Sequence, residues 1–195
     1  VAIATGRTYQ SALRFYTEVG STLPLMVYQG ALVKDPQTGT VHRHWTVPKH
    51  LALKLLDDFE QPSLRFRLSV HFYIDDQLFV REVTPETANY VSRSVIQPIA
   101  VGDLRQTLDV EPTKILALSD DIQLMNEIFD HLRRRYSPSE LYLTKSTPTF
   151  VEATHPQVSK GAAVRYLAEE YLGMGADQVM AIGDNLNDLE MIEYA

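Results

Sequence analysis

The stretch that decides the fold is Met180-Ala181-Ile182-Gly183-Asp184-Asn185-Leu186-Asn187-Asp188-Leu189-Glu190-Met191-Ile192. A short apolar run, residues 179–182, ends in a glycine and is followed by two carboxylates with two carboxamides between them. Apolar residues then return at helical spacing, so the pattern predicts a strand, a polar loop and a helix. Because ligands of open α/β sheets bind beyond the carboxyl ends of the strands, we expect chemistry at Asp184 and Asp188.

The side chains of this loop suggest a metal site. Carboxylate and amide oxygens are hard ligands, and Mg²⁺ takes one or two carboxylates while it keeps several waters. The alternative is that Asp and Asn serve here as loop and helix-capping residues. The loop alone does not separate these two interpretations.

Composition and charge exclude several classes of function. The 195 residues, 45% hydrophobic and 22% charged, indicate one or two globular domains. The net charge of −7 argues against sequence-independent nucleic-acid binding, which depends on Lys and Arg. Without cysteine the chain has no disulfide or thiolate chemistry. No apolar run approaches the ~20 residues of a membrane span and no signal peptide opens the chain, so we expect a cytoplasmic protein without membrane partners.

The chain starts and stops inside predicted elements. Residues 1–4 have the pattern of the end of a buried strand, and residues 191–195 stop inside a helical pattern. We therefore expect the sequence to be an interior piece of a longer protein.

The first part of the chain predicts a frame of alternating strands and helices. Val1–Ala4 is followed by Thr5-Gly6-Arg7 and then by Thr8, which we expect to cap a helix. Residues 25–28 read as a short strand. The turn residues 35–39 lie between two further apolar runs and predict a hairpin.

The middle of the chain has a different pattern of apolar and polar residues. Alternating runs on either side of 75–77 predict an antiparallel hairpin, and helices are expected at 48–59, 85–95 and 121–135. Strands are expected at 114–118, 141–144 and 150–153, followed by a helix at 159–172 and a strand at Val179. We expect an α+β layer, residues 48–147, inserted between frame segments 1–47 and 148–195.

Two further polar sites lie beside frame elements. In Thr5-Gly6-Arg7, a glycine at a strand-to-helix turn lets backbone N–H groups approach an anion. Lys160 follows the predicted cap Ser159, although a cation in the first turn of a helix opposes the macrodipole by ~0.3–1 kcal/mol. Such local inconsistency is expected at functional sites, and an exposed surface lysine is the alternative.

Three motifs occur in order along the chain, and together they carry a resemblance: Ala4-Thr5-Gly6-Arg7, Val158-Ser159-Lys160-Gly161 and Gly183-Asp184-Asn185-Leu186-Asn187-Asp188. With the large insertion between the first two, the chain resembles the haloacid dehalogenase superfamily of phosphohydrolases, in its Cof-like branch with a large cap domain. The resemblance covers the whole chain. It implies an α/β fold with a doubly wound parallel sheet, a Rossmann-like core, and an inserted α+β cap.

The resemblance also implies roles for the loop residues. Thr5 and Gly6 would hold the transferring phosphoryl group, and Lys160 would neutralise it beside the nucleophile. Thr5 and Lys160 are thus the candidate catalytic residues in this chain. Asp184 would bind Mg²⁺ directly, and Asp188 would contribute to the metal site more indirectly.

Three more positions follow from the resemblance. Asn187 would orient phosphate or the lysine, and Arg7 would support the phosphate loop or the substrate. Gln29-Gly30-Ala31 stands where relatives usually have Asn-Gly-Ala, and this departure weakens the case for a substrate contact by Gln29.

One expected motif is absent. The nucleophile and the acid/base of the family are two aspartates in an Asp-x-Asp motif on the strand before Thr-Gly-Arg, and no Asp-x-Asp occurs in these 195 residues. That carboxylate attacks phosphorus to form an aspartyl-phosphate, which water hydrolyses. We therefore expect the 195 residues alone to be inactive and the parent protein to be active.

The expected reaction is Mg²⁺-dependent hydrolysis of a small phosphorylated metabolite, such as a sugar phosphate or a phosphorylated cofactor, with the cap closing over the site. A phosphomutase on the same core, or a binding protein that lacks the nucleophile, are the alternatives. A P-type ion pump shares some core motifs, but this piece has no membrane segment.

Other polar residues have simpler interpretations. His42 and His44 share a strand face and could pair on a metal, although an exposed polar face is the preferred interpretation. Arg133-Arg134-Arg135 suits the end of a helix. His71 and Tyr73 share a face of a cap strand; they face either substrate or, in the preferred interpretation, the cap helices.

Overall fold

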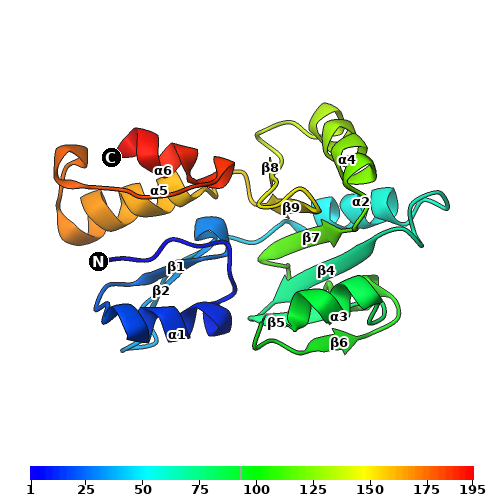
Figure 1. The fold of residues 1–195 in the computed structure, drawn as a ribbon, viewed down its shortest axis with the longest axis horizontal. Coiled ribbons are helices and arrows are strands. Elements are labelled where there is room, and N and C mark those ends of the chain that lie inside the picture. Colours follow the sequence, from blue (N-terminus) through cyan, green and yellow to red (C-terminus); the bar gives the residue numbers. More distant parts are fainter. Residues whose placement is uncertain (93) are drawn as a thin grey trace. The chain divides into compact units, whose positions relative to one another are not determined.

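The computed structural model describes residues 1–92 and 94–195 and divides into two compact units. The first unit comprises residues 1–45 and 157–195, and the second comprises residues 46–156 (Figure 1). Strands and helices are mixed in both units, and the second is inserted into the first, which is the α/β class with an α+β insertion that the sequence predicts. In the described part of the chain, no helix is both long and apolar enough to cross a bilayer.

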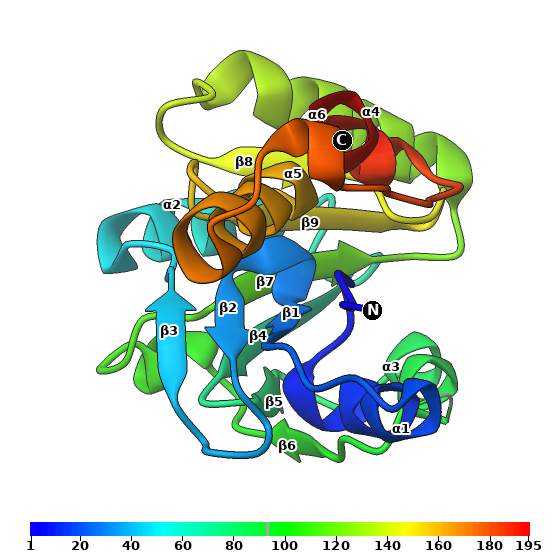
Figure 2. The ribbon, with the colours of Figure 1, turned by 90° about the vertical axis from the view of Figure 1, so that its left-hand side faces the viewer.

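The first unit contains a small antiparallel sheet and helices from both ends of the chain. The sheet has the order β1 (Leu25–Val27), β2 (Leu32–Lys34) and β3 (Val41–His44), shown side by side in Figure 2. The helical elements are α1 (Tyr9–Val19), α5 (Lys160–Arg165) with its π-helical continuation Tyr166–Leu172, short 3₁₀ turns at Tyr28–Gly30, Ala176–Gln178 and Leu186–Asp188, and α6 (Leu189–Tyr194). The antiparallel pairing of β2 with β3 confirms the hairpin predicted around residues 35–39.

Side-chain caps fix where the helices of the first unit begin. Thr8 accepts a hydrogen bond from the backbone N–H of Ser11 and so caps α1, as predicted. Ser159 accepts from the backbone N–H of Ala162 and caps α5, which places Lys160 at the first helical position. From β1 and β2, Met26 and Val33 pack against α5 and its continuation, and this contact forms the apolar core of the unit.

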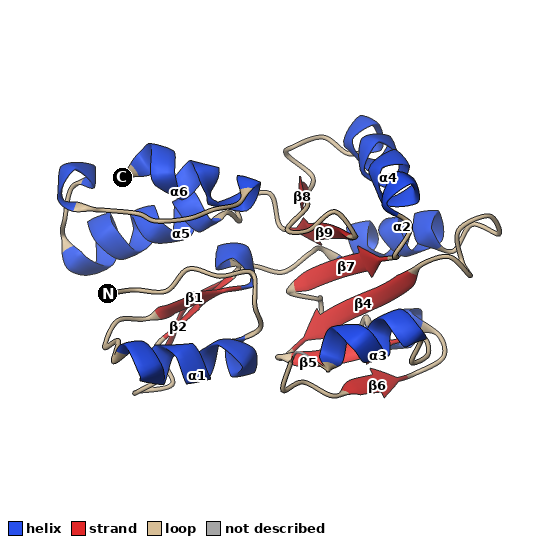
Figure 3. Cartoon of the chain, in the orientation of Figure 1, coloured by secondary structure: helices blue, strands red, loops and turns tan. Residues whose placement is uncertain are grey.

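Two segments expected as strands have no ladder. Residues 1–4 form only one parallel bridge, from Ala4 to Met26. The strand predicted at Val179 is wrong: residues 179–183 are drawn as loop in Figure 3 and are not paired in the described chain. An apolar run forms a strand only where another strand pairs with its backbone N–H and C=O groups. In the absence of such pairing among the described residues, the side chains of Met180 and Ile182 are 85% and 82% exposed.

The second unit is built on a six-stranded sheet of order β6-β5-β4-β7-β9-β8. Its elements are α2 (Lys49–Phe59), β4 (Ser69–Ile74), β5 (Gln77–Val80), α3 (Pro85–Val91), β6 (Pro98–Ala100), a 3₁₀ turn (Leu104–Thr107), β7 (Lys114–Leu118), α4 (Ile122–Arg135), β8 (Tyr142–Thr144) and β9 (Phe150–Thr154). The expected division at 147/148 differs from the observed one at 156/157, because β9 pairs with both β7 and β8 and so belongs to this sheet.

The two faces of this sheet differ. One face packs Phe72, Ile115 and Val151 against α2 and α4 in the main apolar core. The other face is covered by α3 (Figure 1). It carries His71, which hydrogen-bonds Thr87 of α3 at 2.9 Å. The preferred prediction for His71, burial against a helix of this unit, is confirmed because its side chain is 0% exposed.

A buried ion pair lies on the same face as His71. Lys114 on β7 contacts Glu152 on β9 at 3.0 Å, and both side chains are buried. Burial alone would lower the pKa of Lys114, but the neighbouring Glu152 carboxylate raises it above its ordinary value. The pair was not predicted from the sequence, although Glu152 interrupts the apolar run of β9 and Lys114 begins that of β7.

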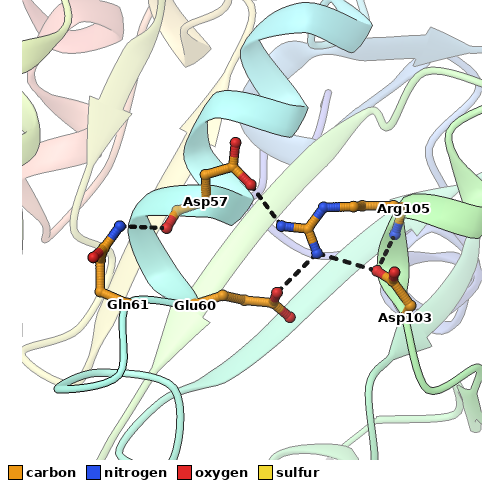
Figure 4. Close-up of polar contacts among 5 residues, drawn as sticks. All are labelled: Asp57, Glu60, Gln61, Asp103 and Arg105. Atoms are coloured by element: carbon orange, nitrogen blue, oxygen red, sulfur yellow. Dashed lines mark hydrogen bonds and ion pairs between the residues drawn. The ribbon is translucent and has the colours of Figure 1, made fainter.

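At the other end of the unit, Arg105 joins three acidic side chains. Its guanidinium donates to Asp57 at 2.5 Å, to Glu60 at 2.8 Å and to Asp103 at 3.3 Å. Figure 4 shows these three contacts converging on Arg105. The hydrogen bonds to Glu60 and then Asp57 raise the pKa of Arg105. This cluster fastens the end of α2 to the turn Leu104–Thr107.

Candidate active site

The loop after Gly183 is organised by the carboxylate of Asp188. Its Oδ2 accepts hydrogen bonds from the backbone N–H groups of Asp184 and Asn185, each at 3.1 Å. A Cβ on Gly183 would lie 2.3 Å from the Cβ of Asp188, so only glycine leaves room for this packing. The loop residues are therefore held around a carboxylate that is itself 4% exposed.

The second oxygen of Asp188 is also engaged. Its Oδ1 accepts a hydrogen bond from Nζ of Lys160, which reaches it from the first turn of α5. Burial alone would raise the pKa of the Asp188 carboxyl, but the bonds from Lys160 and from the N–H groups of Asn185 and Asp184 hold that pKa below its ordinary value. The alternative of a surface lysine is wrong, since Lys160 is 8% exposed and paired.

Asp184 is exposed, in contrast to the buried Asp188. Its carboxylate is exposed, and its Oδ1 accepts a hydrogen bond from Asn185 Nδ2 at 2.9 Å. Within residues 1–92 and 94–195, no three His, Asp or Glu side chains are grouped so as to hold a metal. The Asp184 carboxylate is open to solvent, whereas both oxygens of Asp188 are already hydrogen-bonded.

The Thr5-Gly6-Arg7 turn lies between residues 1–4 and α1. Thr5 Oγ1 accepts a hydrogen bond from the backbone N–H of Arg7 at 3.2 Å, which closes the turn. The guanidinium of Arg7 lies 5.1 Å from the ring centroid of Phe15 in α1. Its side chain therefore lies along the helix, while its backbone carbonyl accepts from Tyr28 at 2.9 Å.

The structure joins the predicted phosphate turn, Thr5-Gly6-Arg7, and the predicted metal loop, residues 184–188, in one network. Gln29 donates its backbone N–H to the carbonyl of Thr5 at 3.0 Å, and its side-chain Oε1 accepts from Asn187 Nδ2 at 2.9 Å. Asn187 thus lies on Gln29 rather than on Lys160. This link was not predicted from the sequence, where the one sign of it is the unusual Gln before Gly30-Ala31.

The two histidines of β3 lie in different environments and do not form a metal pair with a third ligand among the described residues. The His42 ring packs edge-on against Tyr171 with centroids 5.2 Å apart, and His44 is exposed. His71 lies in the second unit, where burial lowers its pKa to about 3 and the nearby charge of Lys114 adds to the effect. None of these residues lies in the network around Lys160 and Asp188.

Comparison with known proteins gives one consistent result. A profile of the haloacid dehalogenase-like hydrolases matches residues 1–195. The chain is 38% identical over 198 residues to a Bacillus subtilis protein named 5-amino-6-(5-phospho-D-ribitylamino)uracil phosphatase YcsE, covering 100% of this chain and 67% of that protein. It is 27% identical to YitU of the same organism, which carries the same enzyme name, over 100% of this chain and 71% of the relative.

Solved structures agree with the sequence relatives. A Thermotoga maritima protein, 27% identical, superposes with a TM-score of 0.78 over 97% of this chain and 69% of its own. A haloacid dehalogenase-like hydrolase from Bacteroides thetaiotaomicron, 20% identical, shares the fold with a TM-score of 0.80 over 100% of this chain and 72% of its own. The family profile and the phosphatase names of the relatives support a phosphoric monoester hydrolase. The chain therefore belongs to the haloacid dehalogenase-like hydrolases.

Proposed function

We propose that the full-length protein hydrolyses a small phosphate monoester with Mg²⁺ through an aspartyl-phosphate, and that this chain supplies the phosphate-binding and metal-binding parts of the site. The observation that carries the proposal is the pairing of Lys160 with Asp188. A cation at the first position of α5 opposes the helix dipole, yet here it is buried and directed at the loop that contains Asp184. Such an arrangement suits neutralisation of a transferring phosphoryl group.

Each group of this chain then has a stated task. The Thr5 hydroxyl and the backbone of Gly6 orient phosphoryl oxygens, and Arg7 supports that turn. Lys160 stabilises negative charge on the equatorial oxygens as the bond to the leaving group breaks. Its position is fixed by Asp188, which acts on the metal loop indirectly.

The residues fit a magnesium ion in a limited sense. Asp184 offers one solvent-exposed carboxylate, and Mg²⁺ is commonly held by one or two carboxylates together with waters and substrate phosphate. When bound, the ion supplies Lewis-acid polarisation of a phosphoryl oxygen and a template for the in-line geometry. The carboxylate of Asp188 keeps the backbone of Asp184 in place by accepting its N–H.

A hollow in the first unit supports a nucleophile from outside these 195 residues. It has a volume of about 540 Å³ and lies between residues 1–4 and residues 178–182, with apolar side chains of the α5 region forming its floor. The first bounding segment leads into Thr5, and the second leads through Gly183 into Asp184. An additional strand in this hollow would end at the level of those two residues and would deliver an aspartate to the phosphoryl group.

The relatives suggest which monoester to try first. Two of them are named for hydrolysis of 5-amino-6-(5-phospho-D-ribitylamino)uracil, a phosphorylated sugar-alcohol derivative. We propose a substrate of this class, a primary phosphate on a polyol or sugar chain.

The test is a panel of phosphorylated metabolites offered to the full-length protein, with released phosphate measured with and without Mg²⁺. Release that requires Mg²⁺, with a phosphorylated protein trapped in acid, is the expected result. Return of the phosphoryl group to another position of the substrate would instead indicate a phosphomutase. Binding of phosphate without turnover would indicate a binding protein. Either outcome would contradict the proposal.

A further inference from the structure

The turn that joins β1 to β2 has a backbone that side-chain residues rarely adopt. Tyr28 has φ 53° and Gln29 has φ 62°, and both side chains are 1% exposed. Two successive non-glycine residues in the left-handed region are strained, and they persist only where the surroundings enforce them. Glycine or asparagine would adopt this backbone at lower cost. The turn alone therefore does not explain why residue 29 is a glutamine.

The contacts of Gln29 supply that reason. Tyr28 and Gln29 donate their backbone N–H groups to the carbonyls of Arg7 and Thr5, so the turn is fastened to both ends of the phosphate turn. The side chain of Gln29 then accepts from Asn187 at 2.9 Å, in the loop that starts at Asp184. One buried residue thus joins two loops that are 158 residues apart in the sequence.

The amide pair carries a cost that a purely structural contact would avoid. Among the described residues, Gln29 Nε2 and Asn187 Oδ1 are buried and have no hydrogen-bond partner. Unpaired buried amide groups destabilise a fold, and two apolar side chains of similar shape would fill the space without that penalty. We therefore attribute this amide contact to the function of the site and not to the stability of the fold.

Gln29 also sets the position of Gly6. A Cβ at residue 6 would lie 2.5 Å from Gln29 Nε2 and 3.0 Å from Cδ, so the glycine backbone rests directly on the amide. A shorter or displaced side chain at residue 29 would let this backbone move. The spacing between Gly6 and Asn187 is therefore set by one amide group.

We infer that Gln29 is a positioning residue of the proposed phosphate site, which acts through Asn187 and Gly6 by fixing the phosphate turn against the metal loop. The inference rests on the proposed function. It predicts that loss of the amide changes turnover more than it changes substrate binding or folding, because a displacement of about 1 Å in a positioned group can lower a rate by up to ~100-fold.

The test compares Gln29→Met, which keeps an unbranched side chain of similar length without the amide, with Gln37→Met on the exposed β2–β3 turn of the same unit. In the full-length protein we expect kcat of Gln29→Met to fall at least about tenfold with KM changed less than about twofold. The thermal melt should show the variant folded at the assay temperature. A kcat equal to that of Gln37→Met would overturn the inference.

A double variant tests the route through Asn187. The combined variant of Gln29→Met and Asn187→Leu should lose less kcat than the product of the two single losses, because both substitutions remove the same contact and only the packing on Gly6 is lost in addition. Losses that multiply would show that Gln29 does not act through Asn187 and would overturn the inference.

Hydrogen exchange separates this inference from the proposed function. If the full-length protein releases no phosphate from any monoester, the proposed function fails, and exchange of the backbone N–H groups of residues 5–7 and 184–188 decides the positioning role. Faster exchange in both segments of Gln29→Met than in Gln37→Met would support it. Equal exchange in the two variants would overturn it.

Discussion

Lys160 and Asp188 form a buried ion pair that joins the first turn of α5 to the loop before α6, and their side chains are 10% and 5% exposed. Removing one partner leaves the other charge buried without compensation, which typically costs ~3–5 kcal/mol. We predict that Lys160→Met lowers the free energy of unfolding by about 3 kcal/mol. The double variant with Asp188→Asn should recover part of that loss in urea denaturation. Lys49→Met is the control, because Lys49 also stands at the first position of a helix, α2, but its side chain is 53% exposed.

A double variant less stable than Lys160→Met alone would show that the pair is not coupled. In the full-length enzyme Lys160→Met should also lower kcat by about 10²–10³-fold, the usual effect of removing a group that stabilises charge in the transition state.

Gly183 tests the packing under the metal loop. In Gly183→Ala the new methyl group would meet the Cβ of Asp188 at 2.3 Å and the loop must shift. Overpacking of this kind costs about 1–3 kcal/mol, and we expect a matching fall in the unfolding midpoint. Gly175→Ala is the matched control, because its Cβ would meet only the mobile end of Asp177. Equal midpoints for the two variants would argue against the tight contact.

His71 gives the second unit a predicted pH dependence. Its pKa is about 3 in the folded protein because burial and then the charge of Lys114 disfavour the protonated ring, which is enclosed by Thr87, Tyr73 and Tyr90. The unfolded chain binds the proton near pH 6.5, so between pH 6.5 and 3 the unfolded state holds more protons and stability falls as the pH falls.

The slope is about 1.4 kcal/mol per pH unit, so the loss between pH 6.5 and 4.5 should be about 2–3 kcal/mol. Denaturant unfolding of His71→Gln should lack this contribution, whereas His131→Gln on the exposed side of α4 should retain it. Parallel pH profiles for His71→Gln and the wild type would refute a neutral buried His71.

The ion pairs of Arg105 with Asp57, Glu60 and Asp103 give a test of stability in the second unit. The Arg105 side chain is 35% exposed, so solvent screens its bonds to Asp57 and Glu60 and the expected contribution is modest. We predict that Arg105→Met lowers the unfolding free energy by about 1 kcal/mol and that the difference shrinks in high salt. Arg134→Met, on the last turn of α4, should have a smaller effect. A loss independent of salt would point to packing instead.

Local sequence patterns predicted the elements whose boundaries depend on neighbouring residues. The caps Thr8, Ser159 and Asp121 are short-range devices, because each side chain reaches a backbone N–H three residues ahead. The β4–β5 hairpin is likewise local, with Asp75 and Asp76 at φ 49° and 61° in its turn. These features could therefore be predicted from sequence alone.

Features that depend on distant partners could not be predicted. The run at Val179 has the composition of a strand, but composition does not show whether a partner strand is present. The placement of Asn187 against Gln29 depends on two loops 158 residues apart and on the strained backbone at residue 29. The Lys114–Glu152 pair depends on the register of β7 and β9, which fixes the end of the inserted unit at a later residue than expected.

The most direct test of the account is phosphate release by the full-length enzyme carrying Asp184→Asn. We measure it at increasing Mg²⁺ against wild type and against Asp177→Asn, an exposed aspartate of the same unit. We expect wild type and Asp177→Asn to share one Mg²⁺ dependence and Asp184→Asn to lose metal-dependent turnover. Turnover by Asp184→Asn with an unchanged Mg²⁺ requirement would contradict the assignment of this loop to the metal.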